Sequence, residues 1–180
     1  MHFRYAVLIS VIVLISAGIF YGLKPEKGIT PSDLNASDIP TASNIDLTET
    51  YTNERFGFSF KYPLGFTIGS VDQPDGSTLV IVQNNKAEGF QISIQPIDED
   101  IQALTVERIR QDLPDIMIQN PQDVILGEHG KGVAFMSDDP TFDGKSREVW
   151  FVFNKTLYQI RTYERYDPLL QAVLSTWEFR

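Results

Sequence analysis

An alternation of apolar and polar residues with a period of two runs through much of the chain after residue 50. TLVIVQ (78–83) is predicted to be a strand. Every second residue is aromatic in FGFSFKY (56–62), and apolar residues alternate with polar ones in FQISIQ (90–95). This period predicts β-strands that turn one face toward a core. REVWFVF (147–153) is apolar on both faces, which is typical of a central strand covered on both sides. The two polar residues after it predict a tight turn into TLYQIRTY (156–163), so these two strands should form a hairpin.

The period changes to that of a helix in two places. Apolar spacing over residues 106–113 predicts the first helix, with Thr105 as its N-cap and Pro114 as its end. The second helix is predicted to have Asp167 as its cap and Pro168 in its first turn. Its apolar stripe consists of Leu169, Leu170, Val173, Leu174 and Trp177.

Shorter extended pieces fill most of the remaining chain. They are expected at residues 66–68, 116–118, 124–126 and 131–137, with a short edge strand at 177–180. The order is strands, a helix, more strands and a helix. This order predicts an α+β fold in which helices flank an antiparallel β-sheet.

A run without charged residues at the start of the chain predicts a membrane-spanning helix and not part of the folded domain. Tyr5–Leu23 contains 19 residues between Arg4 and Lys24, and as a helix it would span about 28 Å, close to the hydrocarbon core of a bilayer. One interpretation is a permanent signal anchor, and the other is a cleaved signal peptide with Ser16 and Gly18 ahead of the cut. The apolar run continues past that point, which favours the anchor. We therefore expect one transmembrane helix, with the N-terminus in the cytoplasm and the C-terminal part exported.

The segment after this run lacks periodicity. Residues 24–50 are rich in Pro, Ser, Thr, Asn and Asp, so we expect a disordered linker. The predicted layout is a short cytoplasmic tail (1–4), a transmembrane signal anchor (5–23), this linker, and one folded domain (51–180).

Composition narrows the function classes. The 180 residues are 42% hydrophobic and 12% aromatic, which is enough for one packed core. The net charge of −9 argues against a nucleic-acid-binding protein, which needs a basic surface. The chain has no cysteine, and this excludes disulfides, thiol catalysis, zinc–thiolate sites and iron–sulfur clusters.

Phrases at both ends of the predicted domain resemble a known family. YTNERFGFSFKYP (51–63), the closing REVWFVF, LYQI and STWEF phrases, and the anchored N-terminus ahead of them resemble bacterial PsbP-like domains. That family is named after an extrinsic lumenal protein of photosystem II. The resemblance implies an α-β-α sandwich over about residues 51–180. Membrane-anchored members occur in bacteria without a photosystem, so the resemblance does not imply photosynthesis, and no residue of this chain matches that protein's metal-retention residues.

Candidate catalytic and metal-binding residues are few. His129, the only histidine after residue 50, lies in Gly127-Glu128-His129-Gly130, which predicts a surface turn; no serine sits in a G-x-S-x-G elbow. Asp139-Pro-Thr-Phe-Asp143-Gly144 fails as a calcium loop because its twelfth position is Trp150. With Asp138 this loop is still the best metal candidate, although a simple Asp-Gly turn explains it better. We therefore assign no catalytic, cofactor-binding or metal-binding residue.

Two other groups have competing explanations. Asp98-Glu99-Asp100 could hold a cation, but such triplets more often form a solvated approach to a helix. Tyr158, Tyr163 and Tyr166 could mark a partner surface, although packing in the core and its rim explains them more simply.

These observations predict a membrane-tethered, extracytoplasmic binding or scaffold module of the bacterial envelope that is not an enzyme and has no cofactor. Its expected partners are the membrane, through the N-terminal helix, and an envelope protein or a small ligand, but not nucleic acid. One alternative is a calcium- or manganese-dependent binding protein or hydrolase that uses Asp138, Asp139 and Asp143. Another is an assembly factor for a membrane complex whose partner contacts Tyr5–Leu23.

Overall fold

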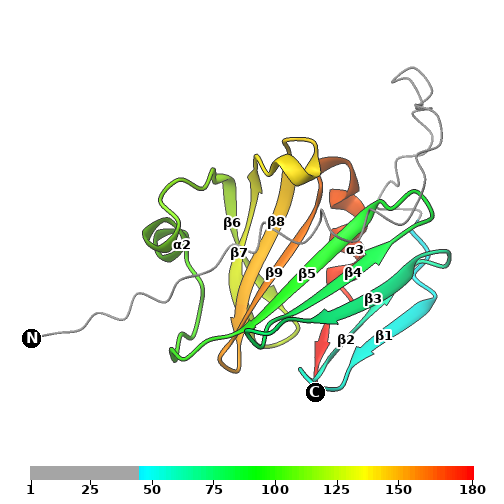
Figure 1. Cartoon of the computed structure of the whole chain (residues 1–180), viewed down its shortest axis with the longest axis horizontal. Coiled ribbons are helices and arrows are strands. Elements are labelled where there is room, and N and C mark those ends of the chain that lie inside the picture. Colours follow the sequence, from blue (N-terminus) through cyan, green and yellow to red (C-terminus); the bar gives the residue numbers. More distant parts are fainter. Residues whose placement is uncertain (1–44) are drawn as a thin grey trace, which may run out of the picture.

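The computed structural model describes residues 45–180 (Figure 1). The predicted tail, the predicted signal anchor and the predicted linker up to residue 44 lie outside the described residues. Between residues 45 and 180, no helix combines the length and apolar character that a membrane span requires.

Two antiparallel sheets form the framework. The larger has seven strands in the order β3-β4-β5-β9-β8-β7-β6, and the smaller has three in the order β1-β2-β10. The bounds in the large sheet are β3 (Thr67–Asp72), β4 (Thr78–Gln83), β5 (Gly89–Pro96), β9 (Thr156–Tyr163), β8 (Ser146–Phe153), β7 (Gly130–Ser137) and β6 (Gln119–Leu126). Those in the small sheet are β1 (Glu49–Asn53), β2 (Phe58–Tyr62) and β10 (Glu178–Phe179). The helices are α2 (Val106–Asp112) and α3 (Asp167–Leu174), with short 3-10 turns η5 (Pro140–Phe142) and η6 (Glu164–Tyr166).

The small sheet and α3 cover one face of the large sheet, here called the α3 face (Figure 1). Aromatic rings dominate the core on this side. Trp177 stacks on Phe58 with ring centroids 4.5 Å apart, and Phe151 stacks on Tyr158 at 4.8 Å. The α3 helix adds the buried side chains Leu169, Leu170 and Val173. The apolar stripe predicted for the second helix therefore points into this core, as expected.

The helix α2 packs on the opposite face, here called the α2 face, over the half of the sheet that contains β7, β8 and β9. Its core is smaller and includes Ile109 of α2, Phe135 of β7 and Trp150 of β8. The sequence expectation of an α+β fold with an antiparallel sheet flanked by helices is confirmed. So is the expectation that REVWFVF is covered on both sides, because five successive residues from Glu148 to Val152 are buried.

The hairpin between β8 and β9 follows from its two-residue turn. Asn154 and Lys155 both have positive φ, at 46° and 54°. This conformation matches the right-handed twist of the flanking strands and fixes the register, with Phe153 opposite Thr156. The predicted cap at Thr105 is also present, since its side chain accepts a hydrogen bond from the Arg108 amide.

The folded part starts earlier than the sequence indicated. Residues 45–50 were predicted to belong to the linker, but Ile45 and Leu47 pack against the core of the α3 face and β1 begins at Glu49. The apolar residues at 45 and 47 alternate with polar ones, which is the period of a strand. The next strand starts later than expected, at Phe58, because Gly57 has a positive φ of 64° in the turn before it.

Two local predictions are wrong. The extended piece predicted at 116–118 is not a strand, whereas the one predicted at 124–126 is extended and forms the end of a longer strand. One strand, β6, runs from Gln119 to Leu126, and its register shifts between Gln119 and Gln122. The side chain of Asp167 does not cap α3; it accepts a hydrogen bond from Arg147 Nε at 2.9 Å, and η6 leads directly into the helix.

Candidate functional site: a polar cluster beside an open sheet face

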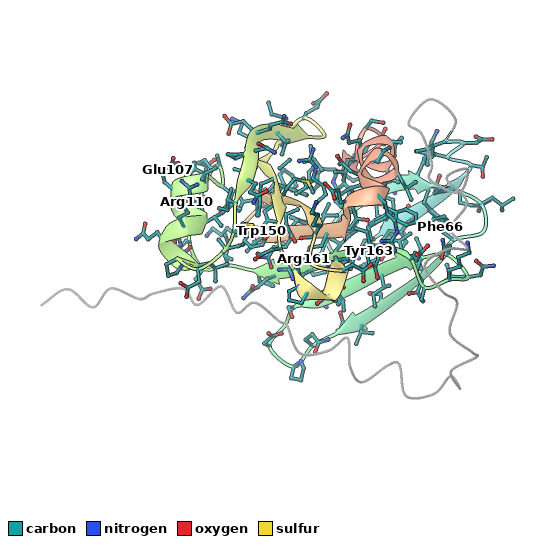
Figure 2. All side chains as sticks on the ribbon, turned by 90° about the horizontal axis from the view of Figure 1, so that it is seen from above. Phe66, Glu107, Arg110, Trp150, Arg161 and Tyr163 are labelled. Carbon is teal, nitrogen blue, oxygen red and sulfur yellow. The ribbon has the colours of Figure 1, made fainter. Side chains whose placement is uncertain are left out.

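A cluster of polar side chains lies on the α2 face, on β8 and β9. Ser146, Glu148 and Trp150 occupy alternate positions of β8 and therefore share a face. The hairpin register places Arg161 of β9 directly opposite Glu148. Figure 2 shows Trp150 and Arg161 near each other in the middle of the molecule, away from Glu107 and Arg110 of α2.

Glu148 is the most deeply buried carboxylate of this cluster, with 2% of its surface exposed. Its Oε1 accepts a hydrogen bond from Ser146 Oγ at 2.7 Å, and its Oε2 accepts one from Trp150 Nε1 at 2.8 Å. Burial raises the pKa of Glu148 above its ordinary value, while the charge of Arg161 and the two hydrogen bonds act against this rise. A carboxylate in such a place depends strongly on its cationic partner.

Arg161 is paired by charge but poorly satisfied by hydrogen bonds. Its Nε lies 3.1 Å from Glu148 Oε2, yet off the direction that a hydrogen bond requires, and its Nη1 lies 3.6 Å from Asp139 Oδ2. Beside it on β9, Gln159 is 3% exposed and its Nε2 has no hydrogen-bond partner within residues 45–180. A buried amide without a partner is costly, so this pair of side chains has unused capacity to donate hydrogen bonds.

The sheet next to this cluster is not covered by α2. We call the side chains of Leu79, Ile81, Gln91, Ser93 and Gln95 the open face. Cross-strand pairing puts all five on the same side, and all five are half-buried. The register also places Gln91 opposite Arg161 and Ser93 opposite Gln159. The polar cluster therefore continues without interruption into a row of uncharged amide and hydroxyl groups.

Comparison with known proteins gives one kind of match. No family model matches the chain, and no curated protein matches it. The solution structure of cyanobacterial PsbP (CyanoP) from Synechocystis sp. PCC 6803 is similar, with 14% sequence identity and a TM-score of 0.48. The match covers 73% of this chain and 92% of that chain. The PsbP resemblance noted in the sequence thus recurs in a solved structure, and at this level it assigns neither a ligand nor a reaction.

The acidic loop predicted as the best metal candidate does not gather its carboxylates. Asp139 caps η5 by accepting a hydrogen bond from the Thr141 amide and faces Arg161, while Asp143 lies 3.2 Å from Arg165. Asp143 has a positive φ of 57°, which suits the turn that was the simpler interpretation. No group of three or more His, Asp or Glu side chains in the described part of the chain is placed to hold a metal ion.

The histidine and the three tyrosines that the sequence singled out lie in a surface turn and in or beside the core. His129 lies in the exposed turn between β6 and β7 and stacks on Phe153 with ring centroids 6.0 Å apart. Tyr158 is 1% exposed and belongs to the core of the α3 face, and Tyr166 is 7% exposed. Tyr163 is half-buried against Phe142, at a centroid distance of 5.1 Å. The packing explanation for the three tyrosines is therefore confirmed.

A second polar cluster lies at the end of the sheet near η6. Arg165 donates to Glu88 at 2.8 Å, and the Tyr166 hydroxyl donates to the other oxygen of Glu88, also at 2.8 Å. Partial burial acts to raise the pKa of Glu88, but these hydrogen bonds and the charge of Arg165 outweigh it and lower the pKa. Burial, together with Glu88, raises the pKa of Tyr166 to about 12. Every charged group here has a partner, so this cluster serves to hold η6 against the β4–β5 turn.

In the acidic triplet before α2, Glu99 forms an ion pair with Arg108. Glu99 accepts a hydrogen bond from Arg108 at 2.7 Å, and this bond lowers the pKa of Glu99. Arg108 also donates to Asp112 at 2.6 Å, so its guanidinium lies between two carboxylates. A small hollow beside α2 is lined by Ile97, Glu99, Ile101, Leu104, Arg108, Asp112 and Leu157.

The sequence reasoning missed Glu148, Gln159 and Arg161. A signal for two of them was available, because the two-residue turn after Phe153 fixes the pairing of the predicted hairpin. Counting back from that turn places Glu148 opposite Arg161. Opposite charges that face each other on a strand that is otherwise apolar on both sides indicate a buried ion pair.

Proposed function

We propose that this chain is a non-catalytic binding module that uses the open face of its large sheet to hold a protein partner. The observation that carries the proposal is the continuity between the open face and the buried amide of Gln159, whose Nε2 has no partner in the described part of the chain. In this proposal residues 5–23 tether the module to the bacterial membrane, and the face is presented outside the cytoplasm.

The uneven cover of the large sheet supports this use. The α3 face carries a closed aromatic core, whereas on the α2 face the helix covers only one half of the strands. The other half leaves Leu79 and Ile81 half-buried beside Gln91, Ser93 and Gln95. Aliphatic and uncharged polar side chains in one patch are suited to a protein surface, because each kind of group finds its own kind of contact there.

The chemistry of the cluster supports binding rather than reaction. Its groups are amides, hydroxyls and a guanidinium that already faces two carboxylates. Such groups recognise a partner through hydrogen bonds. A backbone carbonyl of the partner that reached Gln159 or Arg161 would satisfy donors that lack acceptors within residues 45–180, and the gain would favour the bound state.

Photo-crosslinking of the full chain in its native cells tests the proposal. A photoreactive phenylalanine analogue at Ser93, on the open face, should give a discrete protein adduct. The same analogue at Glu107, exposed on α2, is the matched control and should give none. Absence of an adduct at Ser93, or the same adducts from both positions, would contradict the use of this face.

A second variant separates binding from folding. Gln159→Leu removes the unpartnered amide and keeps a side chain of similar volume. Because a buried polar group without a partner is costly, this change should leave the thermal midpoint equal to or above that of the wild type. It should nevertheless lower the yield of the Ser93 adduct. An unchanged yield would show that Gln159 takes no part in binding.

The tether is tested separately. Carbonate extraction of membranes should leave the full chain in the pellet, and externally added protease should digest the domain in cells whose cytoplasmic proteins stay intact. Release of the chain by carbonate would contradict the anchor while leaving the binding face untouched.

A further inference from the structure

The two end strands of the large sheet differ in how they meet solvent. The outer strand β6 contains a register shift near Pro121, and Asn120 has a positive φ of 49°. A bulge and a proline are devices that prevent another strand from pairing with an edge. The other end strand, β3, pairs regularly with β4 along all six of its residues and contains neither device.

The hydrogen-bond pattern identifies the backbone groups on the outer side of β3. In the turn to β4, the Gln73 amide donates to the Ser77 carbonyl at 2.8 Å. Because inward and outward groups alternate along an antiparallel pair, Val71, Gly69 and Thr67 bond to β4. The amides and carbonyls of Ile68, Ser70 and Asp72 therefore point away from the sheet. No described strand pairs with that side of β3.

We propose that β3 pairs antiparallel with β3 of a second copy of this chain, with Ser70 opposite Ser70, so that the two large sheets become one. The inference does not rest on the proposed function, since it concerns the edge of the sheet and not its open face. Only residues with outward groups can exchange hydrogen bonds, so Ile68, Ser70 and Asp72 must pair with one another, and the twofold axis passes at one of the residues from Ile68 to Asp72.

Backbone hydrogen bonds and side-chain charges both favour the register centred on Ser70. It pairs all three outward residues and forms about six backbone hydrogen bonds, whereas a register centred on any other residue of the strand forms fewer. It places Asp72 opposite Ile68 of the second copy, so no like charges face each other. A register centred on Asp72 would bring two carboxylates together.

The same register gives a steric match on the α2 face. Gly69 lies opposite Val71 of the second copy, and the space where a Cβ of Gly69 would lie has no atom within 4 Å. Val71 is a large apolar side chain that is 40% exposed in the single chain. Pairing would lay each Val71 over the bare backbone of the opposite Gly69, and this removes apolar surface from water twice per dimer.

Disulfide trapping on the full chain tests the register directly, because the chain has no cysteine of its own. In a hydrogen-bonded antiparallel pair the two Cα atoms lie about 5.5 Å apart, within the range for a disulfide. Ser70→Cys in native membranes should therefore give a disulfide-linked dimer under mild oxidation. Thr67→Cys is the matched control on the same strand, and Gln122→Cys is the control on the other edge.

The expected result is a dimer yield from Ser70→Cys about tenfold or more above both controls, because only this position meets its own copy within disulfide reach. Equal yields from Ser70→Cys and Thr67→Cys would indicate random collision and overturn the proposal, as would no dimer from Ser70→Cys.

A proline at the same position gives a second measurement. Ser70→Pro removes an outward amide that makes no bond to β4, so the fold should survive while association is lost. Sedimentation of the full chain in detergent should show a dimer at high concentration for wild type and Ser70→Thr, and a monomer for Ser70→Pro. Association of Ser70→Pro equal to that of Ser70→Thr would overturn the pairing. If Ser70→Pro fails to fold, the disulfide experiment still decides.

Discussion

Replacement of Arg161 by methionine tests whether the buried carboxylate of Glu148 relies on its guanidinium. Methionine keeps an unbranched apolar stem and removes the charge 3.1 Å from Glu148 Oε2. Breaking a buried ion pair by removing one partner costs about 3–5 kcal/mol, because the other charge stays away from water. The hydrogen bonds from Ser146 and Trp150 remain, so we expect a loss near the lower end, about 3 kcal/mol at pH 7.

The loss should depend on pH in a defined direction. Burial already raises the pKa of Glu148, and in Arg161→Met the main opposing charge is gone. The folded variant then binds a proton at a higher pH than the unfolded chain does. Its stability relative to wild type should therefore be lowest above the folded pKa of Glu148 and should recover as the pH falls toward the unfolded value, about 4.3.

Urea unfolding followed by tryptophan fluorescence measures this loss. Both tryptophans of the chain, Trp150 and Trp177, are buried, so their emission reports on the folded state. The double variant Glu148→Gln/Arg161→Met is the control and should regain most of the loss, because it leaves no buried charge. A loss below about 1 kcal/mol at pH 7, or one that stays constant from about pH 7.5 to 5, would show that the buried carboxylate of Glu148 does not depend on Arg161.

Three further predictions concern the backbone. Gly132→Ala should lower the free energy of unfolding by about 1–3 kcal/mol in urea melts, because a Cβ there would overlap the Trp150 carbonyl; Gly69→Ala, in open space, should stay near wild type. Lys155→Gly should raise the thermal midpoint, since lysine at a φ of 54° costs about 1 kcal/mol that glycine avoids; an unchanged midpoint would contradict this. Thr105→Ala should lose about 1 kcal/mol with the cap of α2, and no loss would mean that the cap is unimportant.

Most helices and strands could be predicted, because residues close together in the sequence determine where each of them forms. The apolar run in 78–83 gives β4 with the same bounds, and the turn at Asn154-Lys155 gives the β8–β9 hairpin. The pairing of β5 with β9 could not be read in this way. Five elements lie between those two strands along the chain, and no residue near either strand specifies its distant neighbour.

The candidate site was harder to predict, because it depends on which parts of the large sheet are covered by other elements of the fold. Gln91 and Ser93 look like ordinary solvent-facing residues of an amphipathic strand, and Gln159 looks the same in β9. In the folded chain Gln159 is buried while Gln91 and Ser93 are half-buried, and this difference depends on what packs over each strand and not on the pattern of the strand itself. The acidic loop attracted attention for the opposite reason: its spacing was visible in the sequence, but Asp139 and Asp143 pair with two different arginines, Arg161 and Arg165.

The place of Trp177 has a consequence for the order in which the protein can acquire its structure. Trp177 stacks on Phe58, and just before it Thr176 Oγ1 accepts a hydrogen bond from the Lys61 amide, across 115 positions of sequence. A chain delivered N-terminus first from a ribosome or a translocation channel thus exposes the aromatic side of β2 until residue 177 arrives. We expect assembly to be late and all-or-none, and a stalled, incomplete chain to be a ready target for chaperones and proteases.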